Sequence, residues 1–175
     1  LTVPGVDVTD EPILQHPTDD DYYLTHNEFD RESIWGAYFV PSEWNVSNVD
    51  DMYRVTVIFG HSNGNSMHKK FSVLKYFRDV NFAKEHRYIY LTLGERQTRW
   101  KIFAVADYPI DPSYTIANPD DSYFLTEIAS MKAYSYNQYA TEVGLNDKVL
   151  ILSTCSGSDN YDTRFIVCAK LDEVF

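Results

Sequence analysis

Short runs of apolar residues that alternate with polar ones dominate this chain, a period typical of β-strands. The runs predict strands at residues 36–40, 54–59, 88–93, 100–105, 148–154 and 164–167. In the second run Val55 and Phe59 share one face, and His61 follows just beyond the strand end. Residues 149–152 are apolar without interruption, which is typical of a strand that is packed on both faces.

Two longer stretches follow the helical period instead. Ser66 offers an N-cap, and apolar side chains recur with helical spacing from there to about residue 78. A second helix is predicted from residues 119–121 to about residue 135, with Phe124, Ile128 and Met131 on one side. Many strands with two inserted helices favour a barrel or sandwich over a doubly wound α/β sheet.

The N-terminal third is rich in predicted loops. Residues 3–6 form a turn, and Pro12 confines the extended stretch at 11–15 to a sheet edge or to the beginning of a strand. The acidic triplet at 19–21 is suited to capping a short helical turn at 22–24. Further along, residues 88–105 predict a hairpin with a loop longer than two residues, which leaves its register open.

Length and charge exclude several classes of protein. We expect the 175 residues to form one domain, 1–175, long enough to bury a core without a disulfide or metal. Fifteen basic residues against 26 acidic ones give a net charge of −11, which opposes binding to nucleic acid or anionic lipid. No run of 18 apolar residues occurs, and the chain begins at Leu1 rather than Met. We therefore expect the soluble part of a longer protein, with any anchoring segment upstream.

The richest candidate chemistry lies near the C-terminus, where Cys155 ends a predicted strand and Arg164 begins the next. A guanidinium within about 4–6 Å of a thiol favours the nucleophilic thiolate, and its planar fork can hold an oxyanion. The structural alternative is a surface arginine at the head of an edge strand. Cys168 lies four residues beyond Arg164, about 13 Å along an extended strand, so a disulfide to Cys155 is not expected. Cys168 is interpreted as a small buried side chain.

Acyl transfer by a thiol also needs a proton donor for the departing amine. Of the five histidines, His61 is favoured because it follows a strand and the flexible Gly60. No compact zinc pattern or glycine-rich phosphate loop occurs, and the triplet at 19–21 lacks the ligand spacing of a calcium loop. We therefore predict no metal and no cofactor.

At this point the chain resembles the class B sortases, a family of cysteine transpeptidases. The resemblance covers nearly the whole chain in the family's order, and its Cys and Arg segments are its most specific parts. It rests on Leu152-Ser153-Thr154-Cys155, on the strand at 164–171, on Phe59-Gly60-His61, and on residues 3–6, 21–27, 36–39 and 120–135.

This resemblance implies a mainly β fold, a closed eight-stranded barrel, on the outer face of the Gram-positive cell membrane. Cys155 would attack the Thr carbonyl of a C-terminal sorting signal, His61 would protonate the departing amine, and Arg164 would steady the substrate or oxyanion. The acceptor would be a peptidoglycan amine, or a pilin lysine in some members. No cofactor is implied.

Three further positions follow from the same resemblance. Ser153 matches a serine near the substrate, and Asn27 matches an asparagine near the cleft, although a solvated loop residue fits Asn27 equally well. Phe59 stands where tyrosine is frequent, so any hydrogen bond from that hydroxyl is missing. In the acidic stretch 156–163, Asp159 or Asp162 could pair with Arg164.

The residues leave two alternatives to cell-wall anchoring open. One is a class B pilin polymerase, which differs only in the acceptor amine. The other is a cell-surface β-domain that binds ligands without catalysis. The sorting signal, the acceptor and the oligomeric state cannot be predicted from these residues.

Overall fold

In a computed structural model of the chain, one curled sheet carries most of the fold, and residues 1–62, 69–110, 112–157 and 160–175 are described. The sheet order is β1-β2-β3-β6-β7-β5-β4. Its strands are β1 (Ile13–Leu14), β2 (Tyr38–Phe39), β3 (Val55–Phe59), β4 (Tyr88–Leu93), β5 (Arg96–Pro109), β6 (Val149–Gly157) and β7 (Asn160–Val174). The helices are α1 (Tyr22–Thr25), η1 (Lys70–Arg78), α2 (Val80–Glu85), η2 (Pro112–Thr115) and α3 (Asp121–Tyr134), with η marking 3-10 helices.

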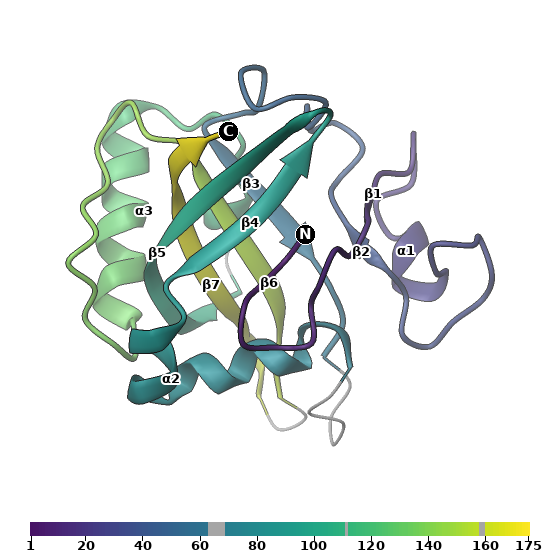
Figure 1. The fold of residues 1–175 in the computed structure, drawn as a ribbon, viewed down its shortest axis with the longest axis horizontal. Helices are drawn as coiled ribbons and strands as arrows, with labels where there is room; N and C mark the ends of the chain where they lie inside the picture. Colours follow the sequence, from purple (N-terminus) through teal and green to yellow (C-terminus); the bar gives the residue numbers. More distant parts are fainter. Residues whose placement is uncertain (63–68, 111, 158–159) are drawn as a thin grey trace.

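The sheet curls into a half-barrel with β1 and β4 at its two edges (Figure 1). The described residues form seven strands in this sheet, so a closed eight-stranded barrel stays a prediction. Near the open side, the N-terminal segment pairs with β4 at an isolated bridge between Thr2 and Tyr90. A single bridge does not extend the ladder, because each further pair of strand residues needs its own backbone hydrogen bonds.

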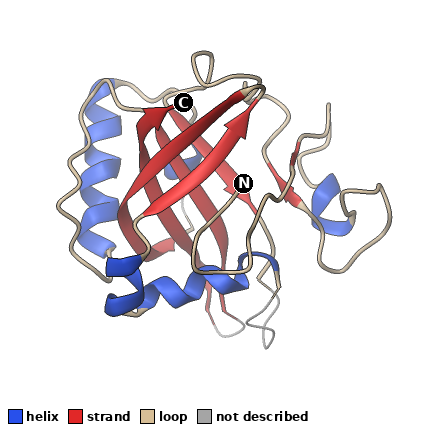
Figure 2. Ribbon diagram, viewed as in Figure 1, coloured by secondary structure: helices blue, strands red, loops and turns tan. Residues whose placement is uncertain are grey.

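Two apolar clusters cover the two faces of the sheet. Helix α3 runs alongside the strands (Figure 2). Inside the curl, Leu150, Leu152 and Phe165 pack with Phe71 and Leu74 of η1. On the outer face, alternate residues of the same strands pack against α3. Because strand side chains alternate between faces, the uninterrupted apolar run in β6 is explained by burial on both sides.

Helix α3 agrees closely with its prediction. Asp120 is the N-cap, and its carboxylate accepts a hydrogen bond from the Tyr123 amide at 2.9 Å. Phe124, Ile128 and Met131 are buried against the sheet, and each stabilises the fold by roughly 1.5–3 kcal/mol relative to exposure. The helix is thereby fixed along the face of the sheet that also carries the candidate site.

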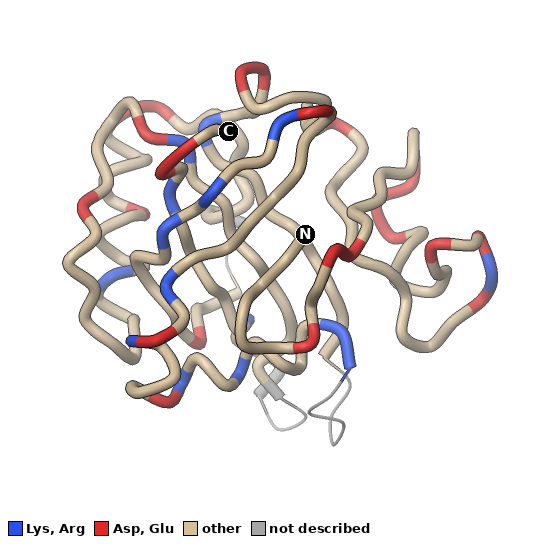
Figure 3. Tube along the Cα trace, viewed as in Figure 1, with Lys and Arg blue, Asp and Glu red and all other residues tan. Residues whose placement is uncertain are grey.

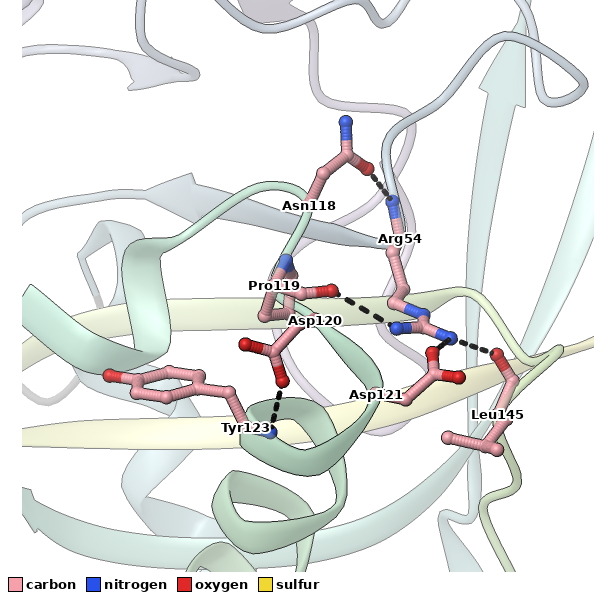
Figure 4. A network of polar contacts seen from close by, with 7 residues as sticks. All are labelled: Arg54, Asn118, Pro119, Asp120, Asp121, Tyr123 and Leu145. Atoms are coloured by element: carbon pink, nitrogen blue, oxygen red, sulfur yellow. Dashed lines mark hydrogen bonds and ion pairs between the residues drawn. The ribbon is translucent and has the colours of Figure 1, made fainter.

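A hydrogen-bond network centred on Arg54 attaches the beginning of β3 to the beginning of α3 (Figure 4). The guanidinium donates to the carbonyl oxygens of Pro119 and Leu145 at 3.0 and 2.6 Å, and to the Asp121 carboxylate at 2.7 Å. It also lies 4.5 Å from the centre of the Phe124 ring. One side chain thus holds three segments together.

Two local predictions need correction. The predicted helix to residue 78 is the 3-10 helix η1, and the separate helix α2 that follows it was missed. Ser66 and Met67 lie outside the described residues. The hairpin loop between β4 and β5 has two residues, not more, because Leu93 pairs with Arg96. Gly94 at φ 58° adopts the left-handed conformation that allows this short connection.

Candidate active site

Three neighbouring strands bring a thiol, an imidazole and a guanidinium together. In the parallel pair β3 and β6, Phe59 is opposite Ser153, so His61 and Cys155 each lie two residues beyond that pairing. In the antiparallel pair β6 and β7, Cys155 is directly opposite Arg164. Adjacent strands are about 4.8 Å apart, so His61 and Arg164 flank Cys155 on its two sides. We call Cys155, His61 and Arg164 the Cys–His–Arg cluster.

Strand alternation places the cluster on the outer face of the sheet. Val57, Ile151 and Ile166 belong to the apolar cluster against α3. Each member of the Cys–His–Arg cluster is an even number of residues from one of them, so its side chain points to the same face. The Cys–His–Arg cluster therefore lies on the same face as these buried apolar side chains, beyond the end of their row.

A pocket of about 600 Å³ opens at this point. Its lining includes the whole Cys–His–Arg cluster. Cys155 is exposed, whereas His61 and Arg164 are half-buried, so the thiol is accessible to a ligand while its neighbours are partly covered by the protein. The pocket is lined by Asp20, Asp21, Leu24, Phe39, Pro41, Glu43, Trp44, Phe59, Gly60, His61, Thr115, Ser153, Thr154, Cys155 and Arg164.

A backbone carbonyl orients the imidazole of His61. Its Nε2 lies 2.6 Å from the carbonyl oxygen of Leu24, just before the end of α1. Because a carbonyl oxygen only accepts hydrogen bonds, Nε2 carries a proton, and Nδ1 is the nitrogen left to give or take one. A Cβ on Gly36, which has φ 53°, would lie 2.2 Å from the Tyr23 carbonyl oxygen and 3.1 Å from the imidazole. Glycine at this position keeps room for the ring.

Arg164 has few partners within the protein. Its Nη1 donates to the Thr163 carbonyl oxygen at 3.4 Å, a weak contact. Among the described residues Arg164 makes no ion pair, so the predicted pairing with Asp162 is not seen, and Asp162 is exposed. The other predicted partner, Asp159, lies outside the described residues. The guanidinium fork is therefore available to a ligand in the pocket.

Ser153 is fully buried and shares the outer face with Cys155. Its hydroxyl is 3.2 Å from the Tyr114 hydroxyl on η2. Burial raises the pKa of the Tyr114 hydroxyl, which therefore stays protonated at neutral pH. Tyr114 also interacts electrostatically with Arg164 and Cys155, so its side chain lies close to the reactive end of the strand pair.

Two cationic side chains of η1, Lys75 and Arg78, contact the chain next to the reactive residues. Arg78 pairs with Asp107 at 2.8 Å and lies 3.5 Å from the Ser156 carbonyl oxygen, directly after the thiol. Lys75 donates to the Ser62 hydroxyl at 2.7 Å, directly after the imidazole. Burial, assisted by the Arg78 charge, lowers the pKa of the Lys75 ammonium. Helix η1 thereby contacts the residue that follows His61 and the residue that follows Cys155.

The remaining predicted positions separate into two groups. Phe59 lines the pocket and stacks on Phe39 with ring centres 5.6 Å apart. Asn27 does not line this pocket. It lines a different pocket, and its side-chain oxygen accepts hydrogen bonds from the amides of Phe29 and Arg31, which shapes the loop after α1. The structure therefore gives Asn27 the alternative loop role and not a place beside the thiol.

Both cysteines are free, as predicted. Cys168 is buried opposite Ile151, and complete burial raises the pKa of its thiol well above the usual range. The two thiols of the chain therefore differ strongly in access to solvent.

Sequence reasoning missed several groups that line the pocket or lie beside it. Tyr114 lies in a segment without helical or strand periodicity, and the Leu24 carbonyl is a backbone group that side-chain patterns do not reveal. The acidic triplet was interpreted only as a helix cap, yet Asp20 and Asp21 line the pocket. No cluster of three or more metal-binding side chains occurs within the described ranges. The helices described there are all too short or too polar to span a membrane.

The fold and the pocket define a class of protein: a half-barrel that presents a Cys–His–Arg cluster from three adjacent strands, as in sortase-type transpeptidases. No family model matches the chain. It is 27% identical over 173 residues to Sortase B of Listeria monocytogenes, covering 98% of this chain and 68% of that protein.

Solved structures agree in fold. Sortase B of Clostridium perfringens has a TM-score of 0.84 and 25% identity, covering 98% of this chain and 91% of that one. A substrate complex of Staphylococcus aureus sortase B has a TM-score of 0.84 and 20% identity, covering 98% and 77%. In both sequence and fold, the chain is thus similar to the class B sortases.

Proposed function

We propose that this protein cleaves a C-terminal sorting signal after threonine and joins the new carboxyl end to an amine of the cell wall. The observation that carries the proposal is the shared pocket of Cys155, His61 and Arg164. An exposed thiol flanked by a proton carrier and a half-buried guanidinium suits acyl transfer through a covalent intermediate.

In the first step, the Cys155 thiolate attacks the threonine carbonyl carbon. A C–S bond forms and the peptide C–N bond breaks, while protonated His61 gives its proton to the departing amine. Arg164 donates hydrogen bonds to the oxygen that becomes negative in between. In the second step, an acceptor amine attacks the thioester carbonyl, the C–S bond breaks, and the amine's proton returns to His61.

Ser153 and Phe59 have lesser roles in this proposal. Phe59 contributes an apolar wall to the substrate pocket. The Ser153 hydroxyl interacts with Tyr114, so we propose that it acts on the peptide partly by fixing that phenol. Staphylococcus aureus sortase B, whose fold this chain shares, has been crystallised with substrate, which supports a peptide as the ligand.

The similarity to class B sortases supports three finer proposals. The acceptor is a peptidoglycan amine, with a pilin lysine as the alternative acceptor. The enzyme works on the outer face of a Gram-positive membrane, held by a segment outside this chain. A further strand at the open side between β1 and β4 completes an eight-stranded barrel.

The test is mass spectrometry of a sorting-signal peptide library that is incubated with the protein and several amines. Cleavage after threonine, with a new amide to one amine class, is the expected result. Cys155→Ala should abolish both products. If peptides are neither cleaved nor joined, while the folded protein still binds them, the non-catalytic surface domain is the correct alternative.

A further inference from the structure

The 3-10 helix η1 has one apolar face and one polar face. Side chains three residues apart lie above one another in such a helix. The apolar face is buried in the core inside the curl of the sheet and consists of Phe71, Leu74 and Phe77. The polar face consists of Ser72, Lys75 and Arg78. The helix contains basic residues but no acidic one, and in Figure 3 its blue positions lie below the strands.

Helix η1 contacts the chain at His61 and at the residue that follows it. The Phe71 amide donates a hydrogen bond to the His61 carbonyl oxygen at 3.0 Å. The Lys75 ammonium donates to the Ser62 hydroxyl at 2.7 Å. Ser62 is only 8% exposed, so water competes little for this second hydrogen bond. One contact therefore reaches the backbone of His61, and the other reaches the side chain directly after it.

The charge of Lys75 is costly at this place. The side chain is half-buried, and its ammonium makes no ion pair within the described part of the chain. Removing an ammonium from water without a counter-charge costs stability, and a neutral amide could donate the same hydrogen bond without that cost. A charged donor, however, makes a hydrogen bond about twice as strong as a neutral one. The contact of Lys75 with Ser62 is therefore stronger than a neutral side chain would make it.

We propose that Lys75 is a positioning residue of the reaction: through Ser62 it fixes the chain after His61, so that the imidazole stays where it can protonate the departing amine. This inference rests on the proposed function, and it assigns a role to a side chain that does not line the active-site pocket. A shift of about 1 Å in a reacting group can cost roughly 100-fold in rate, so a contact one residue away is close enough to matter.

The role of Lys75 can be read from the leaving group. When an amide is cleaved, the departing amine needs the proton of His61. When a 4-nitrophenyl ester is cleaved, 4-nitrophenolate leaves as a stable anion and needs no proton. A misplaced imidazole therefore slows cleavage of the amide much more than cleavage of the ester. Damage to the thiol or to the fold slows both.

The experiment uses two probes that share one peptide, the best-cleaved member of the sorting-signal library up to its threonine. One probe continues through the native amide, and the other ends in a 4-nitrophenyl ester of the threonine. Single-turnover reactions with protein in excess report the release of each leaving group in the acylation step alone. The test variant is Lys75→Met, which keeps the apolar stem. The control is Lys84→Met, which removes a positive charge from an exposed position on α2.

Lys75→Met should release the amine roughly 10- to 100-fold more slowly than the native protein and should release 4-nitrophenolate within about threefold of the native rate. Lys84→Met should keep both rates. Equal slowing of both probes overturns this inference, because Lys75 also interacts electrostatically with Cys155 and would then act on the thiol or the fold. An unchanged rate of amine release in Lys75→Met overturns it as well.

A second variant tests the path through Ser62 and serves if Lys75→Met does not fold. Ser62→Ala removes the acceptor and should slow the amide probe to a similar extent, again with little effect on the ester. The double variant Lys75→Met/Ser62→Ala should be no slower than either single variant, because both break the same contact. Losses that multiply overturn the path through Ser62. If the native protein cleaves neither probe, or Cys155→Ala cleaves them equally fast, the proposed function itself fails and this inference falls with it.

Discussion

Replacing Arg164 by lysine separates charge from geometry at the active site. Lysine keeps the positive charge but loses the planar fork of donors, which a rigid oxyanion contact requires. Arg164 makes only a weak 3.4 Å contact to Thr163 and no ion pair among the described residues. The folded protein therefore depends little on this side chain, and the free energy of unfolding should change by less than about 0.5 kcal/mol.

The effect of Arg164→Lys on the reaction should be much larger than its effect on stability. Loss of one donor to a developing oxyanion typically costs about 2.7–4 kcal/mol, so kcat should fall roughly 10²- to 10³-fold. The KM should change less, because the contact strengthens only as charge develops on the oxygen. Peptide cleavage is measured with steady-state kinetics, and urea unfolding gives the stability of the same samples.

A matched substitution makes the result specific. Arg96→Lys alters another arginine, on β5, which pairs with Asp50 at 2.7 Å and does not line the pocket. This control should keep native turnover. If Arg164→Lys also keeps turnover within about threefold, the oxyanion role of Arg164 is refuted, because loss of a hydrogen-bond donor to the oxyanion should lower turnover far more than that.

Three further predictions concern the support of the site and the fold. Tyr114→Phe removes the hydroxyl that lies 3.2 Å from the Ser153 hydroxyl, so the free energy of unfolding should fall by about 1–2 kcal/mol and kcat/KM should decline. An unchanged kcat/KM would show that the Tyr114 hydroxyl does not position the pocket. Arg54→Met removes three hydrogen bonds and the contact with the Phe124 ring. Urea unfolding should show that the free energy of unfolding falls by about 2–4 kcal/mol, with normal activity per folded molecule. A decrease of less than about 1 kcal/mol would contradict the importance of this network. Burial raises the pKa of the Tyr108 hydroxyl to about 12 in the folded protein. Above about pH 10 the Tyr108 hydroxyl is therefore deprotonated in the unfolded chain but still protonated in the folded protein. Because the unfolded state then binds fewer protons, the free energy of unfolding should fall by up to about 1.4 kcal/mol per pH unit until the folded pKa is reached. Tyr108→Phe should flatten that alkaline slope in urea unfolding at pH 9 to 11, and an unaltered slope would exclude Tyr108 as its source.

Periodicity predicted the elements whose burial is regular. Strand β3 and helix α3 lie within a residue or two of their expected bounds, because each buries a continuous stripe. Strands β5 and β7 run longer than expected, since their polar outer ends, such as Arg96–Thr98, continue the backbone ladder without an apolar pattern. Backbone pairing needs no particular side chain, so sequence patterns underestimate such ends.

The candidate site was predictable to the extent that its residues end strands. Cys155, His61 and Arg164 each follow or begin an apolar run, and the family resemblance joined them. The pocket wall was not predictable, because Glu43 comes from a connection between strands and the Leu24 carbonyl is a backbone group that side-chain patterns do not reveal. Tyr114, which contacts Ser153, comes from a segment without helical or strand periodicity. For Asn27 the sequence left two roles open, and the structure shows its side-chain oxygen accepting hydrogen bonds within its own loop.

The central claim is that Cys155 forms a thioester with the substrate. Acid quenching of the protein a short time after mixing with a sorting-signal peptide, followed by intact-mass and peptide-mapping spectrometry, tests it most directly. We predict an added mass equal to that of the peptide up to and including its threonine, less one water, located on Cys155 and removed by hydroxylamine. The absence of that adduct while cleavage proceeds, or its appearance on another residue, would contradict the account.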